Sequence, residues 1–141
     1  MRKQYQFWPG ATGIDAWDVD RLIDLTREFP VIEVEIASIA EIDSAYWFFG
    51  HDESPTVRRI VDHIRLIDEA DLRYPIILCD DGRVMDGMHR IARALLENRP
   101  TIRAVKFPQQ PEPDFRNCRA ADLPYDVVAD QQRGRLKRRR N

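Results

Sequence analysis

The feature of this sequence that most restricts its fold is a β-hairpin followed at once by a glycine and a helix. The run Tyr74–Cys79 is almost continuously apolar, which is typical of a strand covered on both faces. Asp80-Asp81-Gly82-Arg83 predicts a tight turn, because Asp-Gly tolerates positive φ, and Val84-Met85 predicts the returning strand. Gly87 then opens a helix that ends at Asn98, a residue suited to a left-handed cap.

The remaining periodicities predict an α/β (α+β) domain, with a small mixed sheet flanked by helices. Alternating apolar and polar residues predict two half-buried strands, and helical spacing predicts two further helices. These elements are a helix from a cap at Asp15 or Asp18 to about Glu28, a strand at Val31–Ile36, a helix from Ser54 to about Asp71 with an apolar stripe at Val57, Ile60, Val61, Ile64 and Ile67, and a strand at Thr101–Phe107.

Changes in composition divide the chain into four segments. Residues 1–30 are expected to form an N-terminal arm, irregular over residues 4–13, and a helix packed on the domain, whereas residues 31–107 form its core. Residues 108–130 are rich in proline and predict an extended segment that wraps the body. Residues 131–141 predict a disordered basic tail.

Composition and charge limit the classes of protein to which the chain can belong. At 141 residues, with 43% hydrophobic and 33% charged residues, it is expected to be one globular domain. No apolar run is long enough to cross a membrane and no signal core follows the first residues, so a cytoplasmic location is expected. Cys79 and Cys118 lack partners at metal-ligand spacing and are expected to be reduced thiols.

Charge is distributed unevenly along the chain. The tail, residues 131–141, holds six basic residues and no acid, whereas residues 1–130 hold 16 basic and 24 acidic side chains, a net charge of −8. An acidic body does not favour duplex DNA as a partner. Two interpretations of the tail stay open: a solvated end that keeps the protein soluble, or an arm that contacts a polyanion such as a nucleic acid.

The start of the helix at Gly87 predicts a phosphate-binding site. A helix N-terminus carries unpaired N–H groups and partial positive charge, and glycine allows the backbone to approach a ligand closely. The N–H groups of Met88, His89 and Arg90 would point at a phosphate, and the Arg90 guanidinium could bind two of its oxygens. His89 could donate a hydrogen bond or act as a general acid, and Arg93, one turn later, could reach a second phosphate.

Asp86, directly before the glycine, has several roles open to it. Its carboxylate could orient an arginine, bind Mg²⁺, or act as a base toward a hydroxyl group. The structural alternative is a helix cap that pairs with Arg83 or Arg90, and His89 could likewise be an ordinary hydrogen-bonded histidine.

Other candidate groups are an acidic set at Glu33, Glu35 and Glu41, the pair Arg58-Arg59, the cluster His51-Asp52-Glu53, and three tryptophans, Trp8, Trp17 and Trp47, expected to be core anchors.

The segment from Pro75 to Val105 resembles the ParB/sulfiredoxin-like superfamily, which includes ParB N-terminal domains, sulfiredoxins and ParB-like free-serine kinases. The residues that carry the resemblance are Pro75-Ile76-Ile77-Leu78, Val84 to Ala94 with the core Asp86-Gly87-Met88-His89-Arg90, and Thr101 to Val105. Members of this superfamily bind nucleotide phosphates at the equivalent loop: ParB proteins bind CTP with Gly-Glu-Arg-Arg, sulfiredoxins bind ATP with Gly-Cys-His-Arg, and the kinases bind ATP or ADP with Asp-Gly-His-His-Arg.

The departures from these motifs narrow the expected function. Met88 stands where sulfiredoxins keep their reactive cysteine, so sulfiredoxin activity is not expected. The second arginine of the ParB motif is absent and no helix-turn-helix pattern follows, so partitioning activity is not expected either. The kinase and sulfiredoxin versions of the motif are the nearest.

The sequence therefore predicts a nucleotide-binding protein that holds the phosphates of ATP, ADP or CTP with Gly87, Met88, His89, Arg90 and Arg93. A chemical step, ATP-dependent phosphoryl transfer or NTP hydrolysis with Mg²⁺, would use Asp86, His89 and Glu35. The acceptor and any metal ligands are not identified, and a homodimer is left open. The alternative is a non-enzymatic ParB-like regulator or adaptor that binds protein or nucleic acid through its surface and the 131–141 tail.

Overall fold

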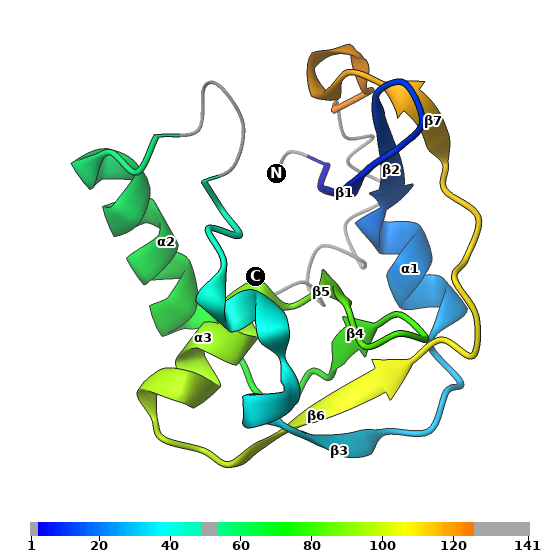
Figure 1. Cartoon of the computed structure of the whole chain (residues 1–141). Helices are drawn as coiled ribbons and strands as arrows, with labels where there is room; N and C mark the ends of the chain where they lie inside the picture. The colour runs from blue at the N-terminus through cyan, green and yellow to red at the C-terminus, as the bar shows by residue number, and fades with distance from the viewer. Residues whose placement is uncertain (1–2, 49–53, 126–141) are drawn as a thin grey trace, which may run out of the picture.

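Two small sheets and three α-helices make up residues 3–48 and 54–125, the part of the chain that the computed structural model describes (Figure 1). This arrangement confirms the predicted α/β (α+β) class. The first sheet has the order β1 (Tyr5–Pro9), β2 (Ile14–Asp18), β7 (Phe115–Cys118), and the second has the order β3 (Ile32–Glu35), β6 (Thr101–Lys106), β4 (Ile76–Leu78), β5 (Val84–Asp86). The helices are α1 (Val19–Leu25), α2 (Val57–Glu69) and α3 (Met88–Leu96), with short 3-10 turns at Ile36–Ser38, Ala40–Asp43 and Ala120–Asp122.

The four-stranded sheet is mixed and is covered on both faces. β4 runs parallel to β6, whereas the β3–β6 and β4–β5 pairs are antiparallel. Ile76 belongs to the cluster that contains Ile91 of α3, and Ile77 to the cluster on the other face that contains Trp17. Because successive strand residues point to opposite faces, the continuous apolar run of β4 is buried throughout, as predicted.

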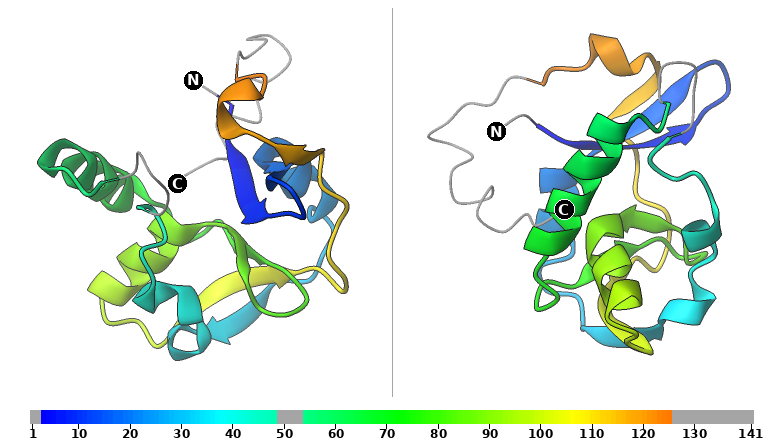
Figure 2. Two further views of the ribbon diagram at one scale, coloured as in Figure 1. Left: turned by 45° about the horizontal axis from the view of Figure 1, so that its top comes forward. Right: turned by 90° about the vertical axis from the view of Figure 1, so that its left-hand side faces the viewer.

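The N-terminal arm is not irregular, and this expectation was wrong. Residues 5–9 and 14–18 form the β1–β2 hairpin, which Gly10 closes by donating its N–H to the carbonyl of Gly13 at 2.8 Å. The proline-rich segment adds β7 to the same sheet, so residues far apart in sequence are neighbours (Figure 2). The turn-forming glycines and the proline hid the short alternating strands from sequence reasoning.

The helices α1 and α2, which precede the β4–β5 hairpin, begin near the predicted caps. Asp18 caps α1, since its Oδ1 accepts from the N–H of Asp20 at 2.9 Å, but the helix ends at Leu25 rather than near Glu28. α2 is capped by Thr56, two residues after the predicted start.

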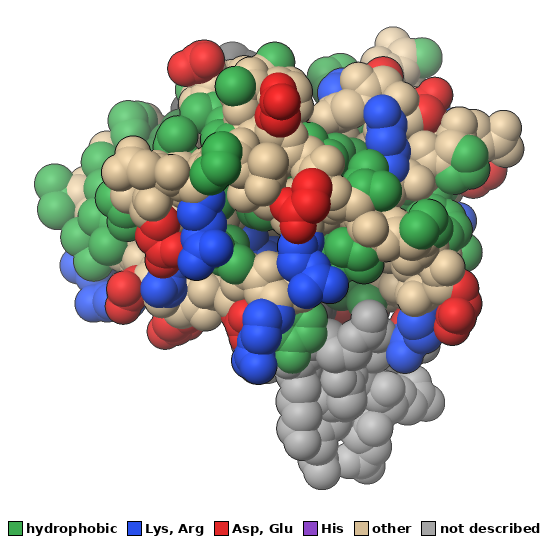
Figure 3. Space-filling view, turned by 90° about the horizontal axis from the view of Figure 1, so that it is seen from below, with side chains coloured by type: hydrophobic (Ala, Val, Ile, Leu, Met, Phe, Trp, Pro, Cys, Tyr) green, Lys and Arg blue, Asp and Glu red, His purple; other side chains and the backbone are tan. Residues whose placement is uncertain are grey.

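Four of the five residues of the predicted apolar stripe of α2 face solvent, whereas the fifth, Ile67, is half-buried. Val57 is 80% exposed and Ile64 55%, and no residue of α2 is fully buried. Figure 3 shows hydrophobic side chains gathered at the left-hand edge of the molecule, where α2 lies. The opposite side of the helix, which includes His63 and Leu66, is the half-buried one.

No helix within residues 3–48 and 54–125 combines the length and the apolar character needed to cross a membrane. The basic tail at 131–141, the last residues of the wrap and the cluster His51-Asp52-Glu53 lie outside the described residues.

Candidate functional site

The start of α3 is built around Gly87, which joins β5 to the helix. Gly87 has φ 112° and ψ 21°, a left-handed conformation that favours glycine. A Cβ at this position would lie 2.6 Å from Cγ2 of Ile76, so the space beside Gly87 is filled by a side chain of β4. The glycine is therefore required by its backbone conformation and by close packing of the helix start on the sheet.

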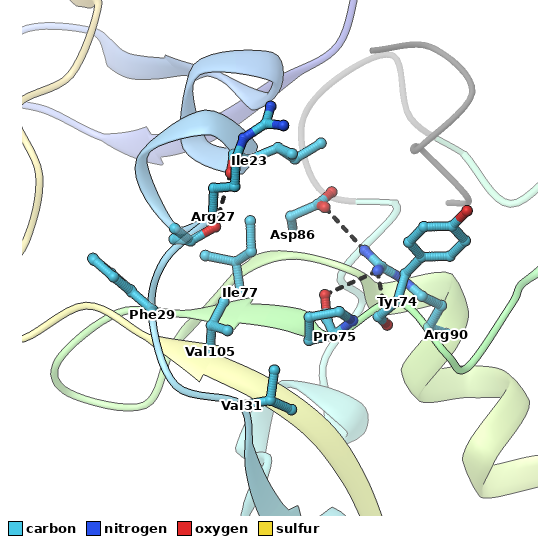
Figure 4. Close-up of a pocket in the computed structure, with 11 residues that line it drawn as sticks. Ile23, Arg27, Phe29, Val31, Tyr74, Pro75, Ile77, Asp86, Arg90 and Val105 are labelled. Atoms are coloured by element: carbon cyan, nitrogen blue, oxygen red, sulfur yellow. Dashed lines mark hydrogen bonds and ion pairs between the residues drawn. The ribbon is translucent and has the colours of Figure 1, made fainter. Parts of the chain in front are cut away.

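Arg90 holds this helix start against the sheet through a buried ion pair (Figure 4). A guanidinium Nη of Arg90 donates to Oδ2 of Asp86 at 2.9 Å, and the two side chains are 4% and 5% exposed. The other Nη donates to the carbonyls of Tyr74 and Pro75 at 3.0 and 2.9 Å. The pairing of Asp86 with Arg90 is the structural alternative that the sequence left open, and it commits both side chains to positioning the helix.

His89 is held between an indole and a second histidine. Its Nε2 lies 2.8 Å from Nδ1 of His63 on α2, and both imidazoles stack on the ring of Trp47, with centroids 4.6 and 4.3 Å away. Burial, followed by the charges of His63 and Arg90, lowers the pKa of His89 to about 3. The imidazole is therefore neutral at physiological pH, and it can orient a ligand but brings no positive charge.

The structure does not bring Arg93 and Glu35 to the start of α3. Arg93 donates to the backbone carbonyl of Asp68 at the end of α2 and, at 2.8 Å, to the carboxylate of Glu97. Glu35 is exposed and pairs with Thr101, which follows the opposite, C-terminal end of α3. β3 and β5 are the two edges of the sheet, so Glu35 and Asp86 lie on opposite edges.

A cavity of about 440 Å³ opens at the start of α3. Its wall combines the helix start with several aromatic rings and with the first described residues of the chain. A volume of this size lies within the range of small-molecule sites. The residues that line it are Lys3, Gln4, Tyr5, Gln6, Val19, Tyr46, Trp47, Met85, Asp86, Gly87, Met88, His89 and Tyr125.

The electrostatic character of this cavity comes from Lys3, two tyrosines and the helix. Lys3 is the only cationic side chain in the described lining, and it forms ion pairs with Asp18 at 3.0 Å and Asp20 at 3.1 Å. Burial, followed by the charge of Asp18, raises the pKa of Tyr5 to about 12, and burial raises the pKa of Tyr46 as well. Both phenols therefore stay protonated at physiological pH, and the N-terminal end of α3 adds its partial positive charge.

A second cavity, of about 240 Å³, lies on the other side of the Asp86–Arg90 pair, between α1 and the sheet (Figure 4). Its wall is mainly apolar, with Ile23, Phe29 and Val105 among the lining residues. Asp86 lines both cavities, whereas Arg90 lines only the smaller one.

The turn of the β4–β5 hairpin carries a third cluster, in which Cys79, Asp80 and Asp81 could present three ligand atoms to a metal ion. Burial raises the pKa of the Cys79 thiol to about 11, and its Sγ donates to Oδ1 of Asp80 at 3.0 Å. A thiol that stays protonated is a weak ligand. Both cysteines, Cys79 and Cys118, are free.

Sequence reasoning missed the residues that complete the cavity. Trp47 was expected to be a core anchor, and it does pack against the core, but it also lines the cavity, while His63 of α2 holds His89 in place. The aromatic run at residues 46–49 was the only signal for this wall in the sequence. Lys3 and Tyr125 reach the cavity because β1 and the wrap fold over it, which no local pattern indicates. Of the acidic candidates, Glu41 has a structural contact, since its Oε2 accepts from the N–H of Val84 at 2.8 Å.

Comparisons of the chain with protein-family models, with curated proteins and with solved structures found no match.

Proposed function

We propose that the protein binds a nucleotide in the cavity at the start of α3, as the motif Asp86–Arg90 and its resemblance to ParB/sulfiredoxin-like proteins suggest. The observation that carries the proposal is the composition of the cavity wall, in which a helix N-terminus meets aromatic rings within about 440 Å³. Helix starts bind phosphate and aromatic rings stack on bases, so the wall offers a site for each end of a nucleotide.

The structure changes which atoms would make these contacts. The N–H groups at the start of α3 and Lys3 are the donors for the phosphates, whereas Arg90 acts indirectly by fixing the helix start through Asp86. Trp47, Tyr46 and Tyr5 are the rings available for the base. Mg²⁺ would arrive bound to the phosphates of ATP, ADP or CTP. It would neutralise part of their negative charge, which the weakly positive wall does not do by itself.

Phosphoryl transfer to a small acceptor or NTP hydrolysis is the catalytic extension of this proposal. Its acid–base group would be His89, whose neutral imidazole can accept a proton, because Asp86 is held by Arg90 and Glu35 lies at the far end of α3. Formation of ADP from ATP or of CDP from CTP in the presence of Mg²⁺ tests both reactions separately from binding, and release of inorganic phosphate identifies hydrolysis. A cytoplasmic location, where these ligands occur, is part of the same proposal.

The test of binding is calorimetry with ATP, ADP and CTP, with and without Mg²⁺, on the wild type and two matched variants. Gln4→Glu places a carboxylate in the cavity wall with almost no change in size, and we expect it to weaken binding about tenfold through repulsion of the phosphates. Gln109→Glu makes the same change at an exposed position outside the cavity and should leave the affinity unchanged.

Tryptophan fluorescence provides an independent readout of the same site. A base stacked on Trp47 should quench emission in Trp8→Phe but not in Trp47→Phe, since Trp8 packs against Trp17 instead. Absence of binding by all three nucleotides, or equal affinities of Gln4→Glu and the wild type, would contradict the proposal.

A second candidate, a non-enzymatic regulator or adaptor, is favoured by one observation, the exposed apolar stripe of α2. In that case the start of α3 would be structural and the surface would carry the function. Failure of every nucleotide to bind, together with salt-sensitive binding of a nucleic acid that is lost on deletion of residues 131–141, would support this candidate.

A further inference from the structure

The α2 stripe, defined as Val57, Ile60, Val61 and Ile64, is an apolar surface that the described body of the molecule leaves uncovered. These side chains are 80%, 42%, 37% and 55% exposed. Single exposed hydrophobic residues are ordinary, but four of them on two successive turns of one helix face form a continuous patch.

The other side of α2 is fixed to the body of the molecule, so the helix cannot bury the α2 stripe without breaking these contacts. His63 contacts His89 and Trp47, and Arg93 donates to the carbonyls of Asp68 and Ala70 at the end of α2. These contacts hold the helix in place with the stripe turned outward, where α2 stands at the edge of the molecule (Figures 1 and 3).

We propose that the α2 stripe is a self-association surface, on which α2 of a second copy of this chain packs in the antiparallel direction. The charges at the two ends of the helix support this occupant. Arg58 lies in the first turn and Asp68 in the last, and both are exposed. An antiparallel pair brings Arg58 of each copy near Asp68 of the other, whereas a parallel pair opposes like charges.

In a two-fold symmetric pair of α2 helices, each contact between the two copies occurs twice. In an isologous dimer the same patch serves both copies, and with Val61 of one copy opposite Ile64 of the other the stripes cover each other. The polar flank of the helix alternates in sign, with Asp62 and Arg65 paired at 3.5 Å, so it presents no continuous basic face to a membrane or a nucleic acid. These properties favour a second copy over the other occupants.

The test is sedimentation velocity of the full chain over a range of concentrations. We expect a monomer–dimer equilibrium whose Kd rises at least about tenfold in Ile64→Ser, because the substitution removes an apolar contact at two symmetric places. The matched control is Leu25→Ser on α1, where an exposed apolar side chain (44%) lies outside the stripe and the Kd should not change. Circular dichroism and urea midpoints confirm that each variant is folded.

A charge reversal distinguishes the orientation. Arg58→Glu should weaken an antiparallel dimer, because the new carboxylate approaches Asp68 of the second copy, and Arg58→Glu with Asp68→Arg should restore it. In a parallel dimer Arg58→Glu alone would not weaken association. A wild type that stays monomeric at about 1 mM, a concentration at which weak complexes form, or a dimer that Ile64→Ser leaves intact, would overturn the proposal.

Discussion

α2 and α3 are both strongly amphipathic helices and they pack on each other, yet they are used in opposite ways. Five residues of α3 are buried: Met88, His89, Arg90, Ile91 and Ala94. α2, which is longer, has no buried residue and turns its apolar stripe to solvent.

The difference comes from how each helix is attached. α3 follows β5 through Gly87 alone, so its first turn must lie against the sheet, and the Asp86–Arg90 pair fixes it there. α2 reaches the body mainly through α3, by way of His63 and the contact of Arg93 with its last turn. Amphipathic periodicity therefore identifies a helix and its apolar face, but attachment to the sheet determines which face is buried.

The largest expected difference between the two helices is in how much their ion pairs contribute to the free energy of unfolding. Arg90→Ala leaves Asp86 buried without its cation and should lower the free energy of unfolding by about 3–5 kcal/mol. Arg65→Ala removes the exposed pair with Asp62 on α2 and should cost at most about 1 kcal/mol. Urea denaturation measures both values.

A small effect of Arg90→Ala would mean that α3 is held by packing alone and that its arginine is available to a ligand. Loss of nucleotide binding in this variant is interpretable only if it stays folded, because the arginine positions the helix start. For that reason the binding test uses Gln4.

The next effect concerns one isoleucine on each helix. Ile91 is fully buried and Ile91→Ala should cost about 2–5 kcal/mol, since it removes apolar contacts and leaves a cavity. Ile64→Ala on the α2 stripe should change stability by about 0.5 kcal/mol or less in the monomer. Urea denaturation at low protein concentration measures both, and equal costs would show that the α2 stripe is covered within one chain.

The sequence was sufficient for the parts of the fold that follow local patterns. The buried run of β4, the Asp-Gly turn, the glycine-led start of α3 and the positions of β3 and β6 were all predicted, because burial and turn chemistry leave period and composition signals. The expected half-burial of β3 was wrong, since only Val34 is partly buried and Ile32 is 41% exposed. The β1–β2 hairpin was missed because its turn-forming glycines and proline hid two short strands, and β7 was missed because it pairs with β2 about 100 positions away.

The position of the candidate site in the sequence was predicted, but the contacts of its side chains were not. The motif Asp86–Arg90 marks the helix start, yet sequence cannot show that Arg90 turns back to Asp86 or that Ile76 fills the space beside Gly87. Both are consequences of how the helix packs on β4. The residues from β1 and α2 that complete the cavity and hold His89 are brought there by tertiary contacts alone.

The smallest of the expected effects lies where the two helices meet, at the His63–His89 contact. The pKa of His89 is lowered to about 3 in the folded protein, from 6.5 for a free histidine, so unfolding takes up a proton below pH 6.5. Stability is therefore complete above about pH 6.5 and falls as the pH drops, by about 1.4 kcal/mol per pH unit from this group. Urea midpoints at pH 7, 6 and 5 measure the slope.

His89→Gln removes this titration and keeps a side chain that can form a hydrogen bond, so its stability should fall less steeply than that of the wild type between pH 6.5 and 5. His51→Gln makes the same change at another histidine of the chain and measures how much that residue contributes to the dependence of stability on pH. If the wild type and His89→Gln lose stability in parallel, the pKa of His89 is not lowered in the folded state, and its imidazole would bring positive charge to the cavity below about pH 6.5. The pH profile thus decides whether the junction between α2 and α3 is a neutral contact or a cationic part of the site.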